Sequence, residues 1–555
     1  MPRSTKRFLP LLVFLALACN TLLPPVRLSV TAPPSARLSV TAPVVEAPTA
    51  APRPTEPATP EPGFGLRPGD ITFHPGPQLY SGDRVSLTID AANADPAWSD
   101  AYVRVYSAGA PPALLGTERF ASFGIGGRAQ ATFWWLWDTA GLVGPQTLTV
   151  TVESAAGGPP LDALTVTAEL RPAEQRPMPE PLAQWAQAES DCCLFHYLTG
   201  TAAARDIDQI RVEADRAFER VETVLGVRRP ERVTFTLLSR LLGHGGFASA
   251  EISVTYIDRN PAGLDLPTLF AHEGTHIVDR QIAAARPTLI TEGLAVYVAG
   301  GHYKPEDLDR RAAALLRLDR YLPLTPLAKD FYRSQHEIGY LEAGALVKYL
   351  VDQYGWPRFR GMLASFEPAA NDAEMLDAGL LAHYGKSLTA LEEEWLTHLR
   401  RFPAESAQTD DLRLTIRLFD LLRRYQQAHD PEAYFLTAWL PDGPAARERG
   451  VVADFVRGPR AAENIALEAM LVAAQQALVA GDYAAAETLL QSVDAVLAAG
   501  LRFDDPLAAR YWQTVTQLAA QGYEVQTLDF TPAGPRVTAI LNWPRLETVT
   551  YNTGQ

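Results

Sequence analysis

Two histidines and two glutamates in a short stretch of this sequence have types and spacing that suit a metal site. His272 and His276 stand four positions apart in His272-Glu273-Gly274-Thr275-His276, and the surrounding apolar residues recur with a helical period. Histidines at i and i+4 share one helix face, so both imidazoles can reach one zinc ion at about 2.0–2.1 Å. Glu273 is turned by about 100° around the helix, which suits a base acting on a nearby water.

A third protein ligand is expected at Glu292, which lies sixteen residues after His276 at the start of another expected helix. Three protein ligands leave one position for water, which is the pattern of catalytic zinc sites. Two other interpretations stay open. The histidines can be helix-surface residues without a metal, or the site can hold zinc without turnover.

Residues from about 190 to 402 resemble the gluzincin zinc metallopeptidases of the MA clan, close to the bacterial peptidase MA-like domains. The resemblance rests on His272, Glu273 and His276, on Glu292 with the Gly-x-Ala-x-Tyr pattern around it, and on Tyr340–Gly355. It implies a thermolysin-like core that binds one zinc ion per chain and hydrolyses peptide bonds by a zinc-activated water. It also implies that His272, His276 and Glu292 are the ligands and that Glu273 is the base and proton shuttle.

The resemblance further places a transition-state tyrosine some fifty residues after the third ligand, where Tyr340 stands. A developing oxyanion needs a donor besides the metal, and His336, one turn earlier, is the alternative. Tyr340 can equally be a core-facing helix residue. Asp279, three residues after His276, is a candidate to orient an imidazole, or simply an exposed helix residue.

One feature departs from the aminopeptidases of this clan. They carry a Gly-x-Met-Glu-Asn segment before the zinc helix, whereas the comparable stretch here, Gly245–Ile252, lacks Met-Glu-Asn. This departure disfavours aminopeptidase activity and favours an endopeptidase or an unusual specificity. The following strand, Glu251–Tyr256, is expected to be an edge strand that borders the cleft and binds an extended peptide by β-addition. The competing hypothesis is a catalytically inactive, surface-anchored binding protein that retains a structural zinc site.

The N-terminus predicts export. Arg3, Lys6 and Arg7 precede an apolar stretch too short to span a membrane, and Ala16-Leu17-Ala18-Cys19 resembles a bacterial lipobox. We therefore expect a signal peptide over residues 1–18 and a lipid on Cys19 that holds the protein on the extracellular face of the cell membrane. The alternative is an ordinary cleaved signal peptide and a secreted protein. The net charge of −15 disfavours binding to nucleic acid.

The N-terminal half divides by composition. Residues 19–63 are rich in Pro, Ala and Thr and are expected to form a linker. Residues 64–172 show six or seven short alternating segments, which predict an immunoglobulin-like β-sandwich. Its aromatic run Phe133–Trp137 suggests either a carbohydrate platform or, more plainly, a strand packed against a neighbouring domain.

The remaining chain is expected to be multidomain. A second linker at residues 173–189 precedes an α+β metallopeptidase domain at 190–403, a helical domain at 404–522 and a β-rich tail at 523–555. Because a disulfide between neighbouring cysteines departs from ordinary bridge geometry, Cys192 and Cys193 are expected to be two half-buried thiols.

Overall fold

The structure is a computed structural model that describes residues 65–550, apart from 92–97, 99–100, 110, 124–127, 244, 250, 264, 303, 404 and 532–533. The predicted signal peptide, Cys19 and the linker at residues 19–63 lie outside the described residues. Across the part of the chain that is described, no helix has both the length and the apolar character needed to cross a membrane.

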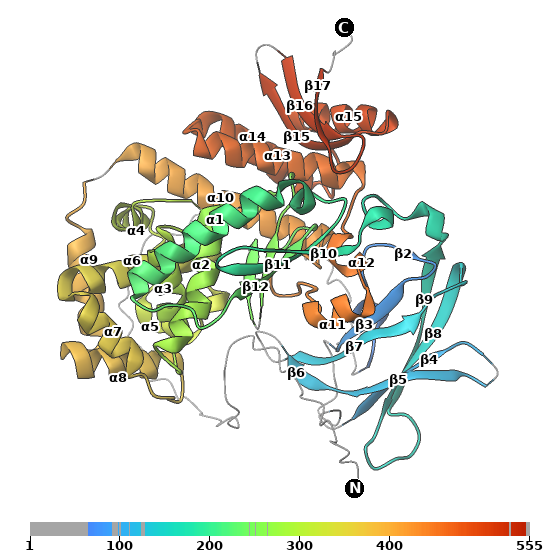
Figure 1. Cartoon of the computed structure of the whole chain (residues 1–555), viewed down its shortest axis with the longest axis horizontal. Coiled ribbons are helices and arrows are strands. Elements are labelled where there is room, and N and C mark those ends of the chain that lie inside the picture. Colours follow the sequence, from blue (N-terminus) through green and yellow to red (C-terminus); the bar gives the residue numbers. More distant parts are fainter. Residues whose placement is uncertain are drawn as a thin grey trace, which may run out of the picture.

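The N-terminal region consists of two β-sheets that share one core (Figure 1). Alternate residues such as Leu87 and Ile89 in one sheet and Val103 and Val150 in the other are fully buried, as the period-two pattern predicts. The first sheet contains, in order, β1 (Ile71–His74), β3 (Arg84–Ala91), β7 (Arg128–Asp138) and β6 (Ala121–Phe123). The second contains β2 (Leu79–Tyr80), β9 (Asp162–Arg171), β8 (Gly144–Glu153), β4 (Tyr102–Ser107) and β5 (Ala113–Arg119). The β-rich character is confirmed, whereas the immunoglobulin-like assignment stays a prediction.

Strand β7 carries the aromatic run, with one face in the sandwich core and the other partly covered by the C-terminal part of the chain. Phe133 and Trp137 are buried in the sandwich core. On the other face, Trp134 stacks on Trp439 with ring centroids 4.7 Å apart, and Trp135 Nε1 lies 3.4 Å from Asp454 Oδ2. These contacts favour a strand packed against the C-terminal part of the chain over a carbohydrate platform.

The sheet of the predicted peptidase domain has the order β10 (Trp185–Glu189), β11 (Cys193–Leu198), β12 (Val233–Leu238), β14 (Ile252–Thr255) and β13 (Gly246–Ala248). The expectation that Glu251–Tyr256 forms an edge strand is wrong. Strand β14 is parallel to β12 on one side and antiparallel to β13 on the other. Its β-branched residues mark a strand buried on both faces, and the edge is the short, glycine-containing β13.

Four helices surround the predicted metal ligands: α1 (Ala202–Leu225), α2 (Leu266–Val278), α3 (Thr288–Ala299) and α6 (His336–Tyr354). Helices α3 and α6 cross at unusually close range. A Cβ on Gly293 would lie 2.4 Å from the carbonyl oxygen of Ala343, and one on Gly344 would lie 2.4 Å from Val296 Cγ1. The two glycines therefore let the helix that carries Glu292 lie directly against the helix that carries Tyr340.

Further helices complete the domain: α4 (Leu308–Arg317), α5 (Leu324–Lys329), α7 (Trp356–Ala364), α8 (Asp372–Tyr384) and α9 (Leu388–Leu399). Together with the sheet and the four helices above, they bury one continuous apolar core. Apart from α1, which lies between β11 and β12, the strands precede the helices, as in the α+β order that the sequence predicts.

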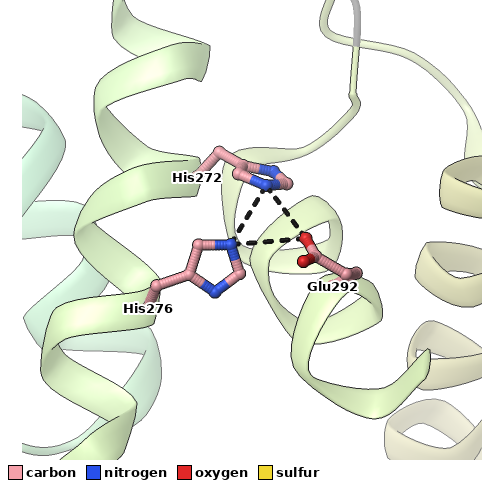
Figure 2. Close-up of side chains that lie close together, drawn as sticks. All are labelled: His272, His276 and Glu292. Atoms are coloured by element: carbon pink, nitrogen blue, oxygen red, sulfur yellow. Dashed lines mark hydrogen bonds and ion pairs between the residues drawn. The ribbon is translucent and has the colours of Figure 1, made fainter. Parts of the chain in front are cut away.

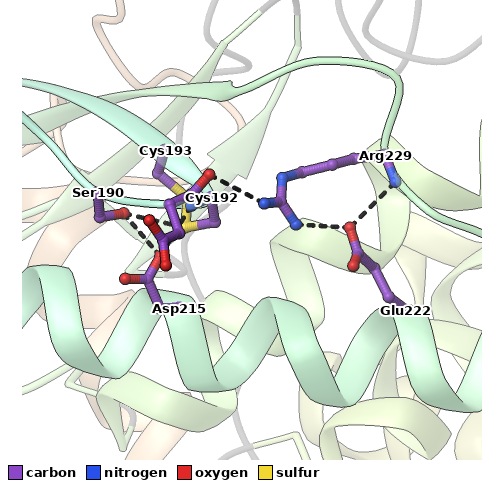
Figure 3. Close-up of a disulfide and its surroundings, with 7 residues drawn as sticks. Ser190, Cys192, Cys193, Asp215, Glu222 and Arg229 are labelled. Atoms are coloured by element: carbon purple, nitrogen blue, oxygen red, sulfur yellow. Dashed lines mark hydrogen bonds and ion pairs between the residues drawn. A yellow bond between two sulfur atoms is a disulfide. The ribbon is translucent and has the colours of Figure 1, made fainter.

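Cys192 and Cys193 are bonded to each other, so the expectation of two thiols is wrong (Figure 3). Both residues are almost fully buried at the start of β11. Asp215 of α1 accepts hydrogen bonds from the Ser190 hydroxyl and from the Cys192 backbone N–H, each at 2.8 Å. The backbone bend that holds the pair is thus anchored by the following helix, through a contact that spacing alone does not reveal.

The C-terminal part is mostly helical and ends in a three-stranded sheet (Figure 1). Its helices are α10 (Ser406–His429), α11 (Gly443–Arg449), α12 (Ala453–Val456), α13 (Ala462–Val479), α14 (Tyr483–Ala498) and α15 (Pro506–Ala520). The strands are β15 (Glu524–Thr531), β16 (Gly534–Ile540) and β17 (Leu546–Thr550). Helix α10 places Leu412 and Ile416 in the peptidase core and Leu418 and Leu422 in the C-terminal core. This helix therefore joins the two regions.

Candidate metal centre

The predicted ligands come from two neighbouring helices and point at one another (Figure 2). His272 and His276 lie on consecutive turns of α2, and Glu292 lies in the first half of α3. The two Nε2 atoms are 3.3 Å apart. Glu292 Oε2 lies 3.4 Å from Nε2 of His272 and 3.3 Å from Nε2 of His276. One carboxylate oxygen and two imidazole nitrogens thus form a nearly equilateral triangle.

The size of this triangle fits a tetrahedral zinc ion. Ligand atoms about 2.0–2.1 Å from the centre of a tetrahedron lie about 3.3–3.4 Å from one another. Glu292 Oε2 and His272 Nδ1 are buried and have no hydrogen-bond partner among the described residues. The three residues therefore fit a metal with a fourth position left over, and no other described residue is needed to complete the set.

The charges of the three ligands are coupled. Burial lowers the pKa of His272 to about 4, so this imidazole is neutral and able to ligate. Burial also disfavours protonated His276, but the adjacent Glu292 carboxylate outweighs it and raises the pKa of His276 to about 9. Burial alone would raise the pKa of Glu292, yet the positive charge of His276 and the two imidazole nitrogens close to its carboxylate hold that pKa well below its usual range. The buried Glu292 carboxylate thus favours positive charge between the three ligand side chains.

Glu273 is buried beside the ligands and faces the edge strand. Burial raises the pKa of Glu273 to about 7, which is suited to accepting and returning a proton near neutral pH. A Cβ on Gly246 of β13 would lie 2.8 Å from Glu273 Oε1 and 2.8 Å from Leu269 Cδ1. The missing side chain at Gly246 therefore makes room for the Glu273 carboxylate.

Both candidate oxyanion donors lie in the first turns of α6, and they differ in position. The Tyr340 ring is 5.9 Å from the ring of His272, whereas His336 packs on Tyr340 at 4.5 Å and on His302 at 4.8 Å. Burial, followed by the charge of Glu292, raises the pKa of Tyr340 well above its usual range. Tyr340 therefore keeps its proton as a donor, and its contact with the His272 ring places it nearer the ligands than His336.

The structure adds residues that the sequence patterns did not indicate. The Tyr332 hydroxyl donates a hydrogen bond to Glu292 Oε1 at 2.7 Å. His302 stacks on Tyr340 with centroids 4.1 Å apart, and its Nδ1 lies 2.9 Å from Glu337 Oε1. His302, His336 and Glu337 form a second buried group whose ligand atoms lie within 4.8 Å of one another. No motif spacing marks Tyr332, His302 or Glu337, because the fold brings them to the site from segments distant from the zinc-ligand motif.

Asp279 is fully buried, so the interpretation as an exposed helix residue is wrong. It forms an ion pair with Arg286, and burial raises the pKa of its carboxyl group to about 6 despite that partner. Its charge contributes to the raised pKa of His276 after the larger effects of burial and of Glu292. Asp279 thus acts on His276 through its charge.

Comparisons with known proteins address the same region. Residues 236–401 match the family model described as Peptidase MA superfamily. No curated protein matches the chain. A solved structure of an aminopeptidase N family protein from Idiomarina loihiensis is 10% identical, with 64% of this chain and 74% of that chain covered and a TM-score of 0.23. All six predicted site residues lie in the matched segment, and residues 236–401 form a Peptidase MA superfamily domain.

Proposed function

We propose that this protein is a zinc-dependent peptidase that hydrolyses peptide bonds, with a thermolysin-like gluzincin site at His272, His276 and Glu292. The observation that best supports this proposal is the triangle of ligand atoms with sides of 3.3–3.4 Å, which lies beside the buried Glu273. When bound, the zinc ion would act as a Lewis acid towards the scissile carbonyl and lower the pKa of a water towards about 7.

The protein's own residues would carry the proton and stabilise the charge. Glu273 takes a proton from the attacking water and passes it to the leaving nitrogen, and the second proton of the water follows, so that one water is consumed and a carboxylate and an ammonium group are formed. Tyr340 donates a hydrogen bond to the carbonyl oxygen as negative charge develops on it. The water-excluding walls around these groups strengthen both interactions.

The proposed activity differs from aminopeptidase action. Glu251 is the only acid in the stretch Gly245–Ile252, and its carboxylate is already bound by Arg447 Nη2 at 2.8 Å and by the Thr236 hydroxyl at 2.7 Å. This supports a site that does not capture a free amino terminus with this residue. We propose endopeptidase action on peptides that add as an extended strand to the edge of β13.

We also propose that the protein is exported and held on the extracellular face of the cell membrane by a lipid on Cys19, with an immunoglobulin-like module between anchor and peptidase. The basic and apolar N-terminal segment supports this proposal. Polypeptides outside the cell or in its envelope would be the substrates. Mass analysis of the mature N-terminus tests it, and an unmodified chain that begins at Met1 would contradict it.

The function is tested by metal analysis together with cleavage of a quenched-peptide library by the mature protein. We expect about one zinc per chain, with Glu273→Gln retaining zinc but losing roughly 10³-fold or more in kcat. Glu219→Gln, at an exposed position on α1, is the control and should match the unaltered protein. Zinc-loaded protein that cleaves no library member would support the inactive binding protein instead. Full activity in Glu273→Gln would exclude the assigned base.

A further inference from the structure

Arg423 of α10 carries a buried guanidinium group without a hydrogen-bonding partner. All three of its side-chain nitrogens are buried, and none has an acceptor among the described residues. Its Cζ lies 4.1 Å from the ring centroid of Phe435. That cation–π contact offsets part of the cost of burying the charge, but it provides no acceptor for the five N–H donors.

The acids whose charges act on Arg423 are already engaged. These are Glu337, which accepts from His302, and Asp420, which accepts from Gln335 Nε2 at 3.1 Å. Burial lowers the pKa of Arg423 to about 10, so the side chain remains protonated at neutral pH. A full positive charge thus lies inside the protein with its donors unused.

The position of this charge links it to the metal centre. Phe435, which lies under the guanidinium, is 6.1 Å from the ring of His336, and His336 is 4.5 Å from the ring of Tyr340. The charge of Arg423 also acts directly on Tyr340, and it opposes the rise in pKa of that hydroxyl. Arg423 therefore reaches from the C-terminal helical region to the side of the site where the oxyanion donor lies.

We propose that Arg423 binds a carboxylate of the peptide substrate. The inference rests on the proposed peptidase function and deepens it by naming a substrate class. A planar guanidinium with unused donors matches a carboxylate bidentately. The carboxylate is either the C-terminus of a short peptide or an Asp or Glu side chain close to the scissile bond. The ring contacts that run from Phe435 through His336 to Tyr340 place Arg423 close to the candidate site, so the carboxylate would lie within a few residues of the scissile bond.

This assignment also gives the C-terminal region a role in the site. Helix α10 buries residues in both cores, and through Arg423 it places a positive charge that acts on Tyr340. A peptidase domain without α10 would then lack the determinant that selects acidic or short substrates.

The test compares four N-acetylated peptides of one sequence, with a free or amidated C-terminus and with or without a Glu next to the scissile bond. In the full-length protein we expect one carboxylate to raise kcat/KM by about 10²-fold, mainly through KM. Arg423→Met should abolish that preference, and Arg423→Lys should retain part of it. Arg424→Met is the matched control, since Arg424 is the next residue on α10 and pairs with Asp494 at 2.6 Å. If the protein prefers peptides with a free C-terminus, Arg423 binds the C-terminal carboxylate. If it prefers peptides with Glu, Arg423 binds the Glu side chain.

Two measurements do not need turnover. In the Glu273→Gln background, the preferred acidic peptide should bind about 10²-fold more tightly than its neutral counterpart, and Arg423→Met should remove the difference. Arg423→Met should also leave the thermal midpoint unchanged or raised, because a buried unpaired charge is removed. Equal binding of all four peptides, or a lowered midpoint with an unchanged preference, would overturn the role of Arg423 while leaving the proposed peptidase function standing. Absence of any cleavage would instead count against that function.

Discussion

Tyr332 holds one oxygen of Glu292 while the other faces the two histidines. The Tyr332 hydroxyl donates to Oε1 at 2.7 Å, and Oε2 lies 3.3–3.4 Å from both Nε2 atoms. The hydrogen bond fixes the rotation of the carboxylate, so the oxygen that would ligate a metal is already directed at the histidines. Partners of this kind raise affinity by preorganising the ligand.

Tyr332→Phe should therefore weaken zinc binding by about 10- to 100-fold without loss of the fold. The measurement is a competition titration with a chromophoric chelator. Tyr349→Phe is the matched control, because Tyr349 donates a similar 2.8 Å hydrogen bond to Glu394 elsewhere in the same domain. Equal zinc affinity in the two variants would show that Tyr332 does not orient the ligand.

Tyr340→Phe should lower kcat by about 10²-fold or more and leave zinc content unchanged, because the lost hydroxyl would stabilise charge only in the transition state. His336→Gln is expected to have a smaller effect on kcat, since His336 contacts Tyr340 and His302. Steady-state kinetics on one cleaved peptide, with metal analysis of each variant, separates the two. A larger loss in His336→Gln would reverse the assignment.

The sequence predicted those parts of the site that local spacing determines. His272 and His276 share a helix face because they are four residues apart, and both lie on helix α2 as their surroundings indicated. Glu292 was identified by the pattern that follows it. The close crossing of α3 and α6 at Gly293 was not predicted, because a glycine in a helix does not reveal which helix it will contact.

Other parts of the site depend on contacts between distant segments. Tyr332 reaches Glu292 from a short turn, Phe331–Arg333, forty residues along the chain. Arg423 belongs to a helix assigned from sequence to a separate region, and β13 is too short to show a strand period. The buried strand β14 was taken for the edge because β-branched residues indicate a strand but do not specify its neighbours.

Gly246→Ala should reduce activity through Glu273. The added Cβ would lie 2.8 Å from Glu273 Oε1, and the carboxylate is the free end of a flexible side chain that would move away. A displacement of about 1 Å costs on the order of 10²-fold in kcat, with zinc affinity and thermal midpoint nearly unchanged. Gly458→Ala is the control, because a Cβ there meets nothing within 4 Å. Full activity in Gly246→Ala would show that the base tolerates the crowding.

Glu342 of α6 should make stability depend on pH. The residue is fully buried, its Oε2 has no hydrogen-bond partner among the described residues, and Oε1 accepts from the backbone of Leu322 at 2.8 Å. Burial raises the pKa of Glu342 well above its usual range, so the folded state keeps this proton while the unfolded state loses it near pH 4.3. The stabilising contribution is therefore complete below that pH and is lost as the pH rises towards the folded-state pKa.

Glu342→Gln keeps an acceptor oxygen for Leu322 and removes the titration, so it should become more stable than the unaltered protein as the pH rises. The difference in free energy of unfolding should grow by up to about 1.4 kcal/mol per pH unit above pH 4.3 until the folded-state pKa is reached. Urea titrations at pH 5, 6, 7 and 8 measure it, with exposed Glu393→Gln as the control. A difference that stays constant across this range would show that Glu342 is ionised in the folded protein.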